Sequence, residues 1–192
     1  MWLALQKDVH LQQQMLMSAD AVVLGIGSAD QLSVAVPRWV MMSLPYLRPK
    51  RVRRELRRRI DHVHPLATRL TGGRFRFTPP EVIAHGWTKS VDAIRLFAGS
   101  EVPLVAVLPA FHRTVYYGGM TTHHRRVHSL FVDLAASHDV TTVDLALLTR
   151  DRLDELNSDG AHWSWDIHRD VGVAMAIALA PQIAAVPRTG QP

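Results

Sequence analysis

Pro103-Leu104-Val105-Ala106-Val107-Leu108-Pro109 is an uninterrupted apolar run of strand length with a proline at each end. Such a run indicates a strand that is buried on both faces, as in a parallel sheet, and proline costs a strand least at its ends. Residues 20–25 form a second apolar run, which a glycine closes, and residues 140–145 form a third, rich in β-branched side chains. The sequence therefore predicts three buried parallel strands.

Helical patterns lie between and after these runs. Residues 78–97 open with Thr78-Pro79-Pro80-Glu81, which combines a Thr N-cap, prolines in the first turn and an early acid. Residues 122–137 and 165–184 also carry apolar side chains at helical spacing. Strands that alternate with helices predict an α/β fold, in which crossovers place helices on both faces of a parallel sheet. We expect one domain over residues 1–186 and a disordered tail over residues 187–192.

The stretch from 33 to 77 does not follow this alternation. It is long, basic and helical in pattern, and Pro45, Pro49 and Pro65 are expected to break it into short helices. Because it is inserted between a strand and its crossover helix, we interpret it as a lid over the carboxyl edge of the sheet, where active sites of such folds lie.

Composition limits the class of protein. A chain of 192 residues with 47% hydrophobic and 20% charged residues can bury the core of one globular domain. The absence of cysteine excludes disulfides, a thiol nucleophile and thiolate metal sites, and it agrees with a reducing cytoplasm. No run reaches the roughly 20 apolar residues that span a bilayer, and residues 1–17 lack the apolar core of a secretory signal. We expect a soluble cytoplasmic protein, and the sequence leaves open whether it is a monomer or a homo-oligomer.

Asp159-Gly160-Ala161-His162 places a carboxylate three residues before an imidazole, after the last strand and before the last helix. A carboxylate in that position can hold an imidazole in one orientation and stabilise its charged form. An imidazole held in this way is the base that a hydroxyl nucleophile needs near neutral pH. We predict that Asp159 and His162 are the catalytic pair, and the alternative is a surface loop whose Asp caps a helix.

Gly25-Ile26-Gly27-Ser28-Ala29-Asp30 follows the first predicted strand. Its glycines would let backbone N–H groups approach an oxyanion, so Gly27, Ser28 and Asp30 are candidate oxyanion and substrate-positioning residues. The pattern is neither the nucleophile elbow of α/β-hydrolases nor a dinucleotide fingerprint. The alternative is an ordinary tight turn between a strand and a helix.

These two blocks carry a family resemblance. Residues 22–30 resemble the third block of the SGNH (GDSL-like) hydrolases, with Ala29 where the family has a side-chain oxyanion donor, and residues 159–162 resemble their final D-x-x-H block. Further matches at 109–112, 117–119 and 122–124 extend the likeness to an acyltransferase branch. The resemblance implies a three-layer, flavodoxin-like fold with strand order 2-1-3-4-5. It also implies His162 as general base and Asp159 as its orienting partner.

Two features of that family have no counterpart in this chain. They are the opening G-D-S block, which carries the nucleophilic serine, and the second strand. We therefore expect the first two strands to be missing, the strand over residues 20–25 to be an exposed edge, and the chain as written to be inactive or nearly so. Ser28 is the one serine near the active edge and is a weaker candidate nucleophile.

The resemblance implies a specific reaction. Members of that branch move an octanoyl group from octanoyl-CoA to diglucosylglycerate in actinobacterial methylglucose lipopolysaccharide synthesis. The partners implied are an acyl-CoA donor as co-substrate and a glycoside acceptor, with no bound cofactor, no metal and no nucleic acid. The alternatives are a plain SGNH esterase, in which water takes the acyl group, and a non-catalytic pseudoenzyme that has lost its nucleophile.

Other histidines and tryptophans flank the predicted site. His112 follows a strand end and Trp163 follows His162, so both are pocket candidates, with structural packing as the alternative. The cluster His123, His124 and His128 could suggest a metal site. No carboxylate stands beside it at ligand spacing, so we interpret it as a solvated helix start near the pocket.

Most of the net charge of +5 comes from a local excess of arginine between residues 48 and 76. Residues 51–59 contain six arginines, and Val52, Leu56 and Ile60 form a thin apolar stripe at helical spacing, which predicts an amphipathic basic helix. A solvated helix face is the default interpretation. The alternatives are a site for the phosphates of an acyl-CoA donor and a membrane or nucleic-acid surface.

Overall fold

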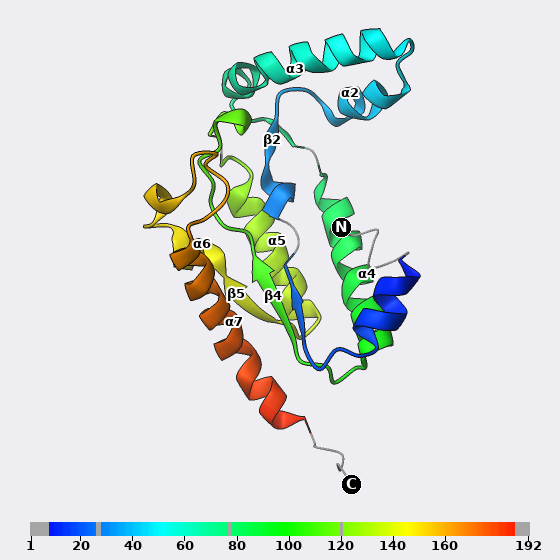
Figure 1. The fold of residues 1–192 in the computed structure, drawn as a ribbon, viewed down its shortest axis with the longest axis vertical. Coiled ribbons are helices and arrows are strands. Elements are labelled where there is room, and N and C mark those ends of the chain that lie inside the picture. Colours follow the sequence, from blue (N-terminus) through cyan, green and yellow to red (C-terminus); the bar gives the residue numbers. More distant parts are fainter. Residues whose placement is uncertain (1–7, 26–27, 77, 120, 187–192) are drawn as a thin grey trace.

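The computed structural model describes residues 8–25, 28–76, 78–119 and 121–186 of the chain. Strands and helices alternate through most of it (Figure 1). In chain order the elements are η1 (Leu11–Leu16), β1 (Val22–Leu24), η2 (Ser28–Gln31), β2 (Ser33–Val34), α2 (Arg38–Ser43), η3 (Leu44–Tyr46), α3 (Lys50–Leu70), β3 (Phe75–Arg76), α4 (Pro80–Ala98), β4 (Leu104–Leu108), η4 (Val115–Tyr117), α5 (His124–Ser137), β5 (Thr141–Asp144), α6 (Leu145–Thr149), η5 (Leu153–Glu155) and α7 (Trp165–Ala185).

The three predicted strands form one parallel sheet in the order β1-β4-β5. Val23 of β1 lies opposite Val105 of β4, and Val107 of β4 lies opposite Val143 of β5. Every residue of β4 is buried, as its uninterrupted apolar sequence predicts. Among the described residues β1 pairs only with β4, so it forms an edge of the sheet, and Val23 is 40% exposed.

The side chains of β4 alternate between two hydrophobic cores. Leu104, Ala106 and Leu108 pack into one core, which α4, α5 and η1 complete. Val105 and Val107 pack into the other core, beneath α7. The strand thus lies in the middle of three layers, and the α/β prediction is confirmed (Figure 1).

Two local predictions about prolines and caps were wrong. Thr78 does not cap α4, because that helix begins at Pro80 with Pro79 as its N-cap and without a side-chain cap. Pro65 does not break the basic segment, because α3 runs through it from Lys50 to Leu70. A proline removes one helical hydrogen bond, and here the buried side chains of His64 and Thr68 hold the helix on either side of it.

His64 ties the inserted segment to the rest of the fold. Its Nε2 accepts a hydrogen bond of 3.2 Å from the backbone N–H of Ala35, so its Nδ1–H donates to the carbonyl of Tyr116 at 2.8 Å. The segment returns through an antiparallel pair of β2 and β3, with Ser33 opposite Arg76. Figure 1 shows α2 and α3 beyond the carboxyl ends of β1 and β4. The segment therefore lies where a lid would lie, and its role as a lid stays a prediction.

Within the described ranges, every helix is too short or too polar to cross a lipid bilayer.

Candidate active site

Asp159 and His162 lie on the loop between η5 and α7 and contact each other directly. Asp159 Oδ2 is hydrogen-bonded to His162 Nδ1, and Oδ1 accepts from the backbone N–H groups of Ala161 (2.9 Å) and His162 (3.0 Å). The backbone donors, with the imidazole after them, hold the pKa of the Asp159 carboxyl far below its usual range. An ionised carboxylate can only accept, so Nδ1 carries the proton and a neutral His162 presents the lone pair of Nε2 as a base.

Gly160 fixes this loop against the segment that follows β4. Its carbonyl accepts a hydrogen bond of 2.7 Å from the backbone N–H of Arg113. Its φ is +68°, and a Cβ at this position would lie 2.7 Å from the carbonyl carbon and oxygen of Arg113. Only glycine satisfies both conditions, so this position of the D-x-x-H block determines where the pair stands.

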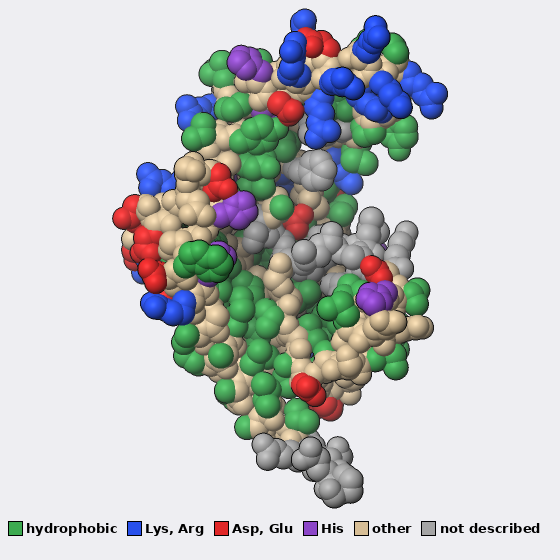
Figure 2. All heavy atoms as spheres, in the orientation of Figure 1, with side chains coloured by type: hydrophobic (Ala, Val, Ile, Leu, Met, Phe, Trp, Pro, Cys, Tyr) green, Lys and Arg blue, Asp and Glu red, His purple; other side chains and the backbone are tan. Residues whose placement is uncertain are grey.

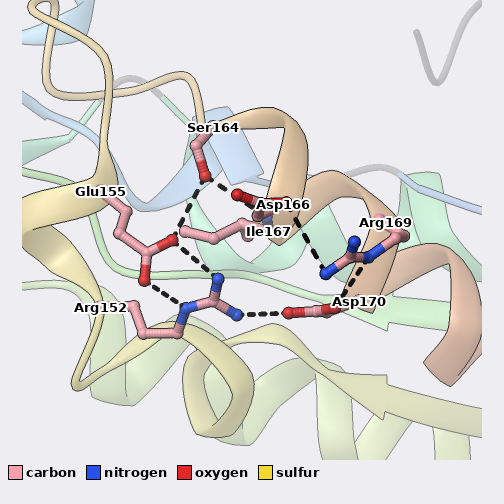
Figure 3. A network of polar contacts seen from close by, with 7 residues as sticks. All are labelled: Arg152, Glu155, Ser164, Asp166, Ile167, Arg169 and Asp170. Atoms are coloured by element: carbon pink, nitrogen blue, oxygen red, sulfur yellow. Dashed lines mark hydrogen bonds and ion pairs between the residues drawn. The ribbon is translucent and has the colours of Figure 1, made fainter.

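A second set of contacts joins the two ends of the same loop (Figure 3). Arg152 binds Glu155 through two parallel hydrogen bonds of 2.6 and 2.7 Å and reaches Asp170 of α7 at 2.6 Å. Ser164 caps α7 by accepting from the N–H of Ile167, and its hydroxyl donates to Glu155 at 3.3 Å. Because Glu155 precedes the loop and Ser164 follows it, this network holds the loop closed at its base.

A cavity of about 450 Å³ opens beside His162. It brings the D-x-x-H loop, through Ala161, His162 and Trp163, together with the turn after β1, through Gly25 and Ala29. Its apolar wall consists of Leu32, Val107, Ala110, Phe111, Leu145 and Met175. Its other polar lining consists of Gln31, His112, Thr114, Tyr117 and His168. A cavity of this size and mixed lining suits a small molecule with an apolar part and a few polar groups.

Only some of the predicted site residues lie at this cavity. His162, Trp163 and His112 line it, and Asp159 lies directly behind His162. Asp30 is buried, with 8% of its surface exposed, and it is not part of the lining. Gly27 and the side chain of Ser28 lie outside the described residues, so a role in holding an oxyanion stays a prediction for them.

Three polar atoms of the lining residues are buried without a hydrogen-bond partner among the described residues. They are His112 Nδ1, Thr114 Oγ1 and Trp163 Nε1. His112 and Thr114 are each 8% exposed, and burial lowers the pKa of His112, so its imidazole is neutral at pH 7. Unpartnered buried polar groups raise the free energy of the folded state and are relieved when a ligand or water bonds to them.

The histidines at the start of α5 are not solvated, and the prediction for them was wrong. His124 is 6% exposed, and its Nδ1–H donates to Gln31 Oε1 at 2.6 Å, while the Gln31 amide donates to the carbonyl of Ala110. Burial lowers the pKa of His124 to about 4. His128 is hydrogen-bonded through Nε2 to Asp144 at 2.9 Å. These contacts come from elements far apart in sequence, so spacing along the helix does not reveal them.

Several residues of the site could not be found by sequence reasoning. Gln31 and Thr114 line the cavity only because β1, β4 and the segments after them converge at one edge of the sheet. Arg152 and Glu155 do have a local signal, since opposite charges three residues apart often pair. In the parts of the chain that the structure describes, no group of three or more potential ligands could hold a metal ion.

Two curated proteins resemble this chain. They are diglucosylglycerate octanoyltransferases from Mycobacterium tuberculosis (strain ATCC 25618 / H37Rv) and from Mycolicibacterium hassiacum. Each is 31% identical to the chain over 166 residues, which make up 84% of it. The chain spans 65% of the length of the first relative and 67% of the length of the second. No protein-family model matches the chain, and no solved structure resembles it significantly.

Proposed function

Because the chain belongs to the diglucosylglycerate octanoyltransferase family, we propose that it is an acyltransferase that moves an octanoyl group from octanoyl-CoA to a hydroxyl of a glucosylglycerate-type acceptor. The observation that carries this proposal is the position of His162. Its imidazole is held by Asp159 and lines a cavity whose walls are partly apolar and partly polar. This geometry supports acyl transfer to a hydroxyl, which is the chemistry that a positioned imidazole base accelerates.

In the proposed reaction His162 handles one proton. Nε2 accepts the proton of the attacking hydroxyl as the oxygen forms a bond to the thioester carbonyl carbon. Asp159 stabilises the imidazolium that results, because its carboxylate stays ionised. When the C–S bond breaks, the imidazolium returns the proton to the thiolate of CoA. The turn over residues 25–30, whose Gly25 and Ala29 line the cavity, is proposed to hold the oxyanion through backbone N–H groups.

The attacking hydroxyl belongs either to a serine, which gives an acyl-enzyme, or to the acceptor itself. Among the described residues no serine hydroxyl is hydrogen-bonded to His162. Intact-mass measurement after mixing the chain with octanoyl-CoA alone separates the two routes. A covalent octanoyl adduct supports the serine route that the SGNH resemblance implies, and product formation without an adduct supports direct attack by the acceptor.

The cavity offers a separate place for each half of the reaction. Leu145 and Met175 provide an apolar wall for an octanoyl chain. The unpartnered groups of His112, Thr114 and Trp163 provide donors and acceptors for sugar hydroxyls. Transfer to a sugar rather than to water requires a covered site, and the segment over residues 33–77 is proposed as that cover.

The test is an acyl-transfer assay with octanoyl-CoA and diglucosylglycerate, in which the octanoylated product is measured by mass spectrometry. Without a G-D-S block the chain is expected to form little product, and any product it forms is expected to fall by roughly 10²- to 10⁴-fold in a His162→Ala variant. An unchanged rate in His85→Ala, an exposed histidine on α4, is the matched control. If octanoate is released equally fast without the acceptor, the chain is an esterase. If a folded chain neither transfers nor hydrolyses, it is a non-catalytic member of the family.

A further inference from the structure

A basic groove lies between the η3 turn and the first half of α3. Four cations line it, Lys50, Arg53, Arg54 and Arg57, and they face one carboxylate, that of Asp61. The cavity has a volume of about 480 Å³, which is within the range of small-molecule sites. Figure 2 shows Lys and Arg side chains gathered over this end of the molecule.

Three of the four cations of the groove are not neutralised by a carboxylate of the described residues. Among the described residues, Lys50, Arg53 and Arg54 have no carboxylate within ion-pair distance. Asp61 accepts a hydrogen bond of 2.8 Å from the hydroxyl of Tyr116 and lies 4.0 Å from Arg57. The groove therefore keeps an excess of positive charge, and a bound anion would reduce the repulsion between its cations.

The opposite side of the same helix behaves differently, which distinguishes the groove from an ordinary solvated face. Arg58 and Arg59 both form ion pairs with Glu55, at 2.8 and 2.9 Å, and lie outside the groove. Within the groove, by contrast, Arg53 is held in place because its Nη1 donates to the carbonyl of Pro45 at 2.7 Å. An unpaired, partly fixed set of guanidinium groups is suited to phosphate oxygens.

The groove adjoins the cavity of His162 through two consecutive tyrosines of η4. Tyr116 lines the basic groove, Tyr117 lines the His162 cavity, and their ring centroids are 5.0 Å apart. A ligand with phosphates at one end and an acyl group at the other could therefore contact both sites along η4.

We propose that the basic groove binds the phosphate groups of a soluble acyl donor whose acyl end is presented to His162. This inference rests on the proposed acyltransferase function and adds the place where the nucleotide phosphates of the thioester donor bind, the groove along α3. The concave shape of the groove favours a small soluble ligand over a flat surface such as a membrane.

The first test is direct binding, measured by titration calorimetry with adenosine 3′,5′-bisphosphate as the probe. Lys50→Gln combined with Arg54→Gln removes two groove charges whose side chains form no hydrogen bond or ion pair among the described residues. Arg58→Gln combined with Arg59→Gln removes the same net charge from the other side of α3. We expect the first pair to weaken probe binding by at least tenfold and the second pair by less than threefold. Equal losses in both pairs, or no binding by the wild-type chain, overturn the proposal.

A vesicle arm separates a soluble donor from a lipid headgroup. Sedimentation with vesicles of anionic phospholipid is expected to leave the chain in solution at physiological salt. The soluble-donor proposal is overturned if the chain binds the vesicles, the Lys50→Gln with Arg54→Gln variant does not, and the wild type fails to bind the probe. The groove would then be a site for a lipid surface.

A substrate comparison distinguishes failure of this inference from failure of the proposed function. Octanoyl-CoA and S-octanoyl-pantetheine carry the same thioester, and only the first carries the nucleotide phosphates. We expect a preference for octanoyl-CoA that disappears in Lys50→Gln with Arg54→Gln. If the wild type uses both donors equally well, the phosphate-binding role of the groove is refuted, and the proposed acyl transfer is still supported. If the Lys50→Gln with Arg54→Gln variant binds the probe more weakly but neither donor gives any transfer, the phosphate-binding role of the groove is supported and the proposed transferase function is refuted.

Discussion

The backbone N–H of Arg113 donates a 2.7 Å hydrogen bond to the carbonyl of Gly160, and this contact joins the D-x-x-H loop to the segment that leaves the central strand. His112 and Thr114 flank Arg113 and line the cavity, and His162 lines it from the other side. One backbone contact therefore sets the distance between the proposed base and the groups proposed to hold the acceptor.

Replacing Gly160 by alanine is expected to displace the pair. The new Cβ meets the Arg113 backbone at 2.7 Å, and φ of +68° is unfavourable for any L side chain. We expect a loss of about 1–3 kcal/mol in the free energy of unfolding and a fall in kcat. Gly172→Ala is the control, since nothing lies within 4 Å of a Cβ there and the residue is inside α7, where alanine is stabilising by roughly 1 kcal/mol. Equal stability of the two variants in urea denaturation contradicts the assignment.

Asp159→Asn is expected to lower kcat by roughly 10²- to 10⁴-fold while leaving the fold intact, because an amide cannot stabilise the imidazolium. The folded pKa of Asp159 is depressed, so its stabilising contribution is present above its unfolded pKa and is lost only as the pH falls through the folded value. If the wild-type rate falls on the acid side of the pH–rate profile near neutral pH, that fall therefore comes from the titration of a group other than Asp159. An Asn variant with wild-type kcat removes the pair from the mechanism.

Thr114→Val tests the acceptor subsite with two readouts, the stability of the protein and the KM for the acceptor. The Thr114 hydroxyl is buried and has no partner among the described residues, so its replacement by an isosteric methyl is expected to leave stability unchanged or to raise it. The same change removes a hydrogen bond to the sugar, and we expect KM for the acceptor to rise by about tenfold while KM for octanoyl-CoA stays constant. A variant that is destabilised and has an unchanged acceptor KM shows that the hydroxyl has only a structural role.

The buried His124 predicts a pH dependence of stability. Its folded pKa, about 4, lies below the unfolded value near 6.5, so the unfolded chain binds the proton first as the pH falls. Stability is therefore complete above about pH 6.5 and falls between there and pH 4, by on the order of 3 kcal/mol. The titratable groups that act on His124 are His128, Asp144 and His112.

His124→Gln isolates this contribution, because it keeps a neutral polar side chain next to Gln31 and removes the titration. The other acid titrations remain in both proteins, so the difference in slope between the wild type and the variant is the measured quantity. His85→Gln, on the exposed side of α4, is expected to keep the wild-type slope. Identical slopes for His124→Gln and the wild type contradict the burial of His124 as a neutral group.

The short-range parts of the fold could be predicted because they are local. Apolar runs of strand length predict β1, β4 and β5, since a strand buried on both faces needs apolar side chains throughout. The prediction was wrong where tertiary contacts override a local rule. Pro65 lies within a continuous helix because His64 and Thr68 are packed on either side of it, and packing outweighs one lost hydrogen bond.

The D-x-x-H pair is local in the same sense. A carboxylate three residues before a histidine can reach it within one turn, so the contact of Asp159 with His162 depends on few other residues. By contrast, the contact of His124 with Gln31 joins residues 93 positions apart, and no local pattern indicates it.

By itself, the sequence determined where the strand and helix segments lie along the chain and which residues form the Asp159–His162 pair, because each depends on neighbours within a few residues. Only the tertiary structure decided that the pair adjoins a cavity shared with His112 and Thr114, and that four cations of α3 surround a groove beside it. Those arrangements depend on how separate elements converge at the carboxyl edge of the sheet. Their free energy comes from long-range packing, which no single stretch of the chain encodes.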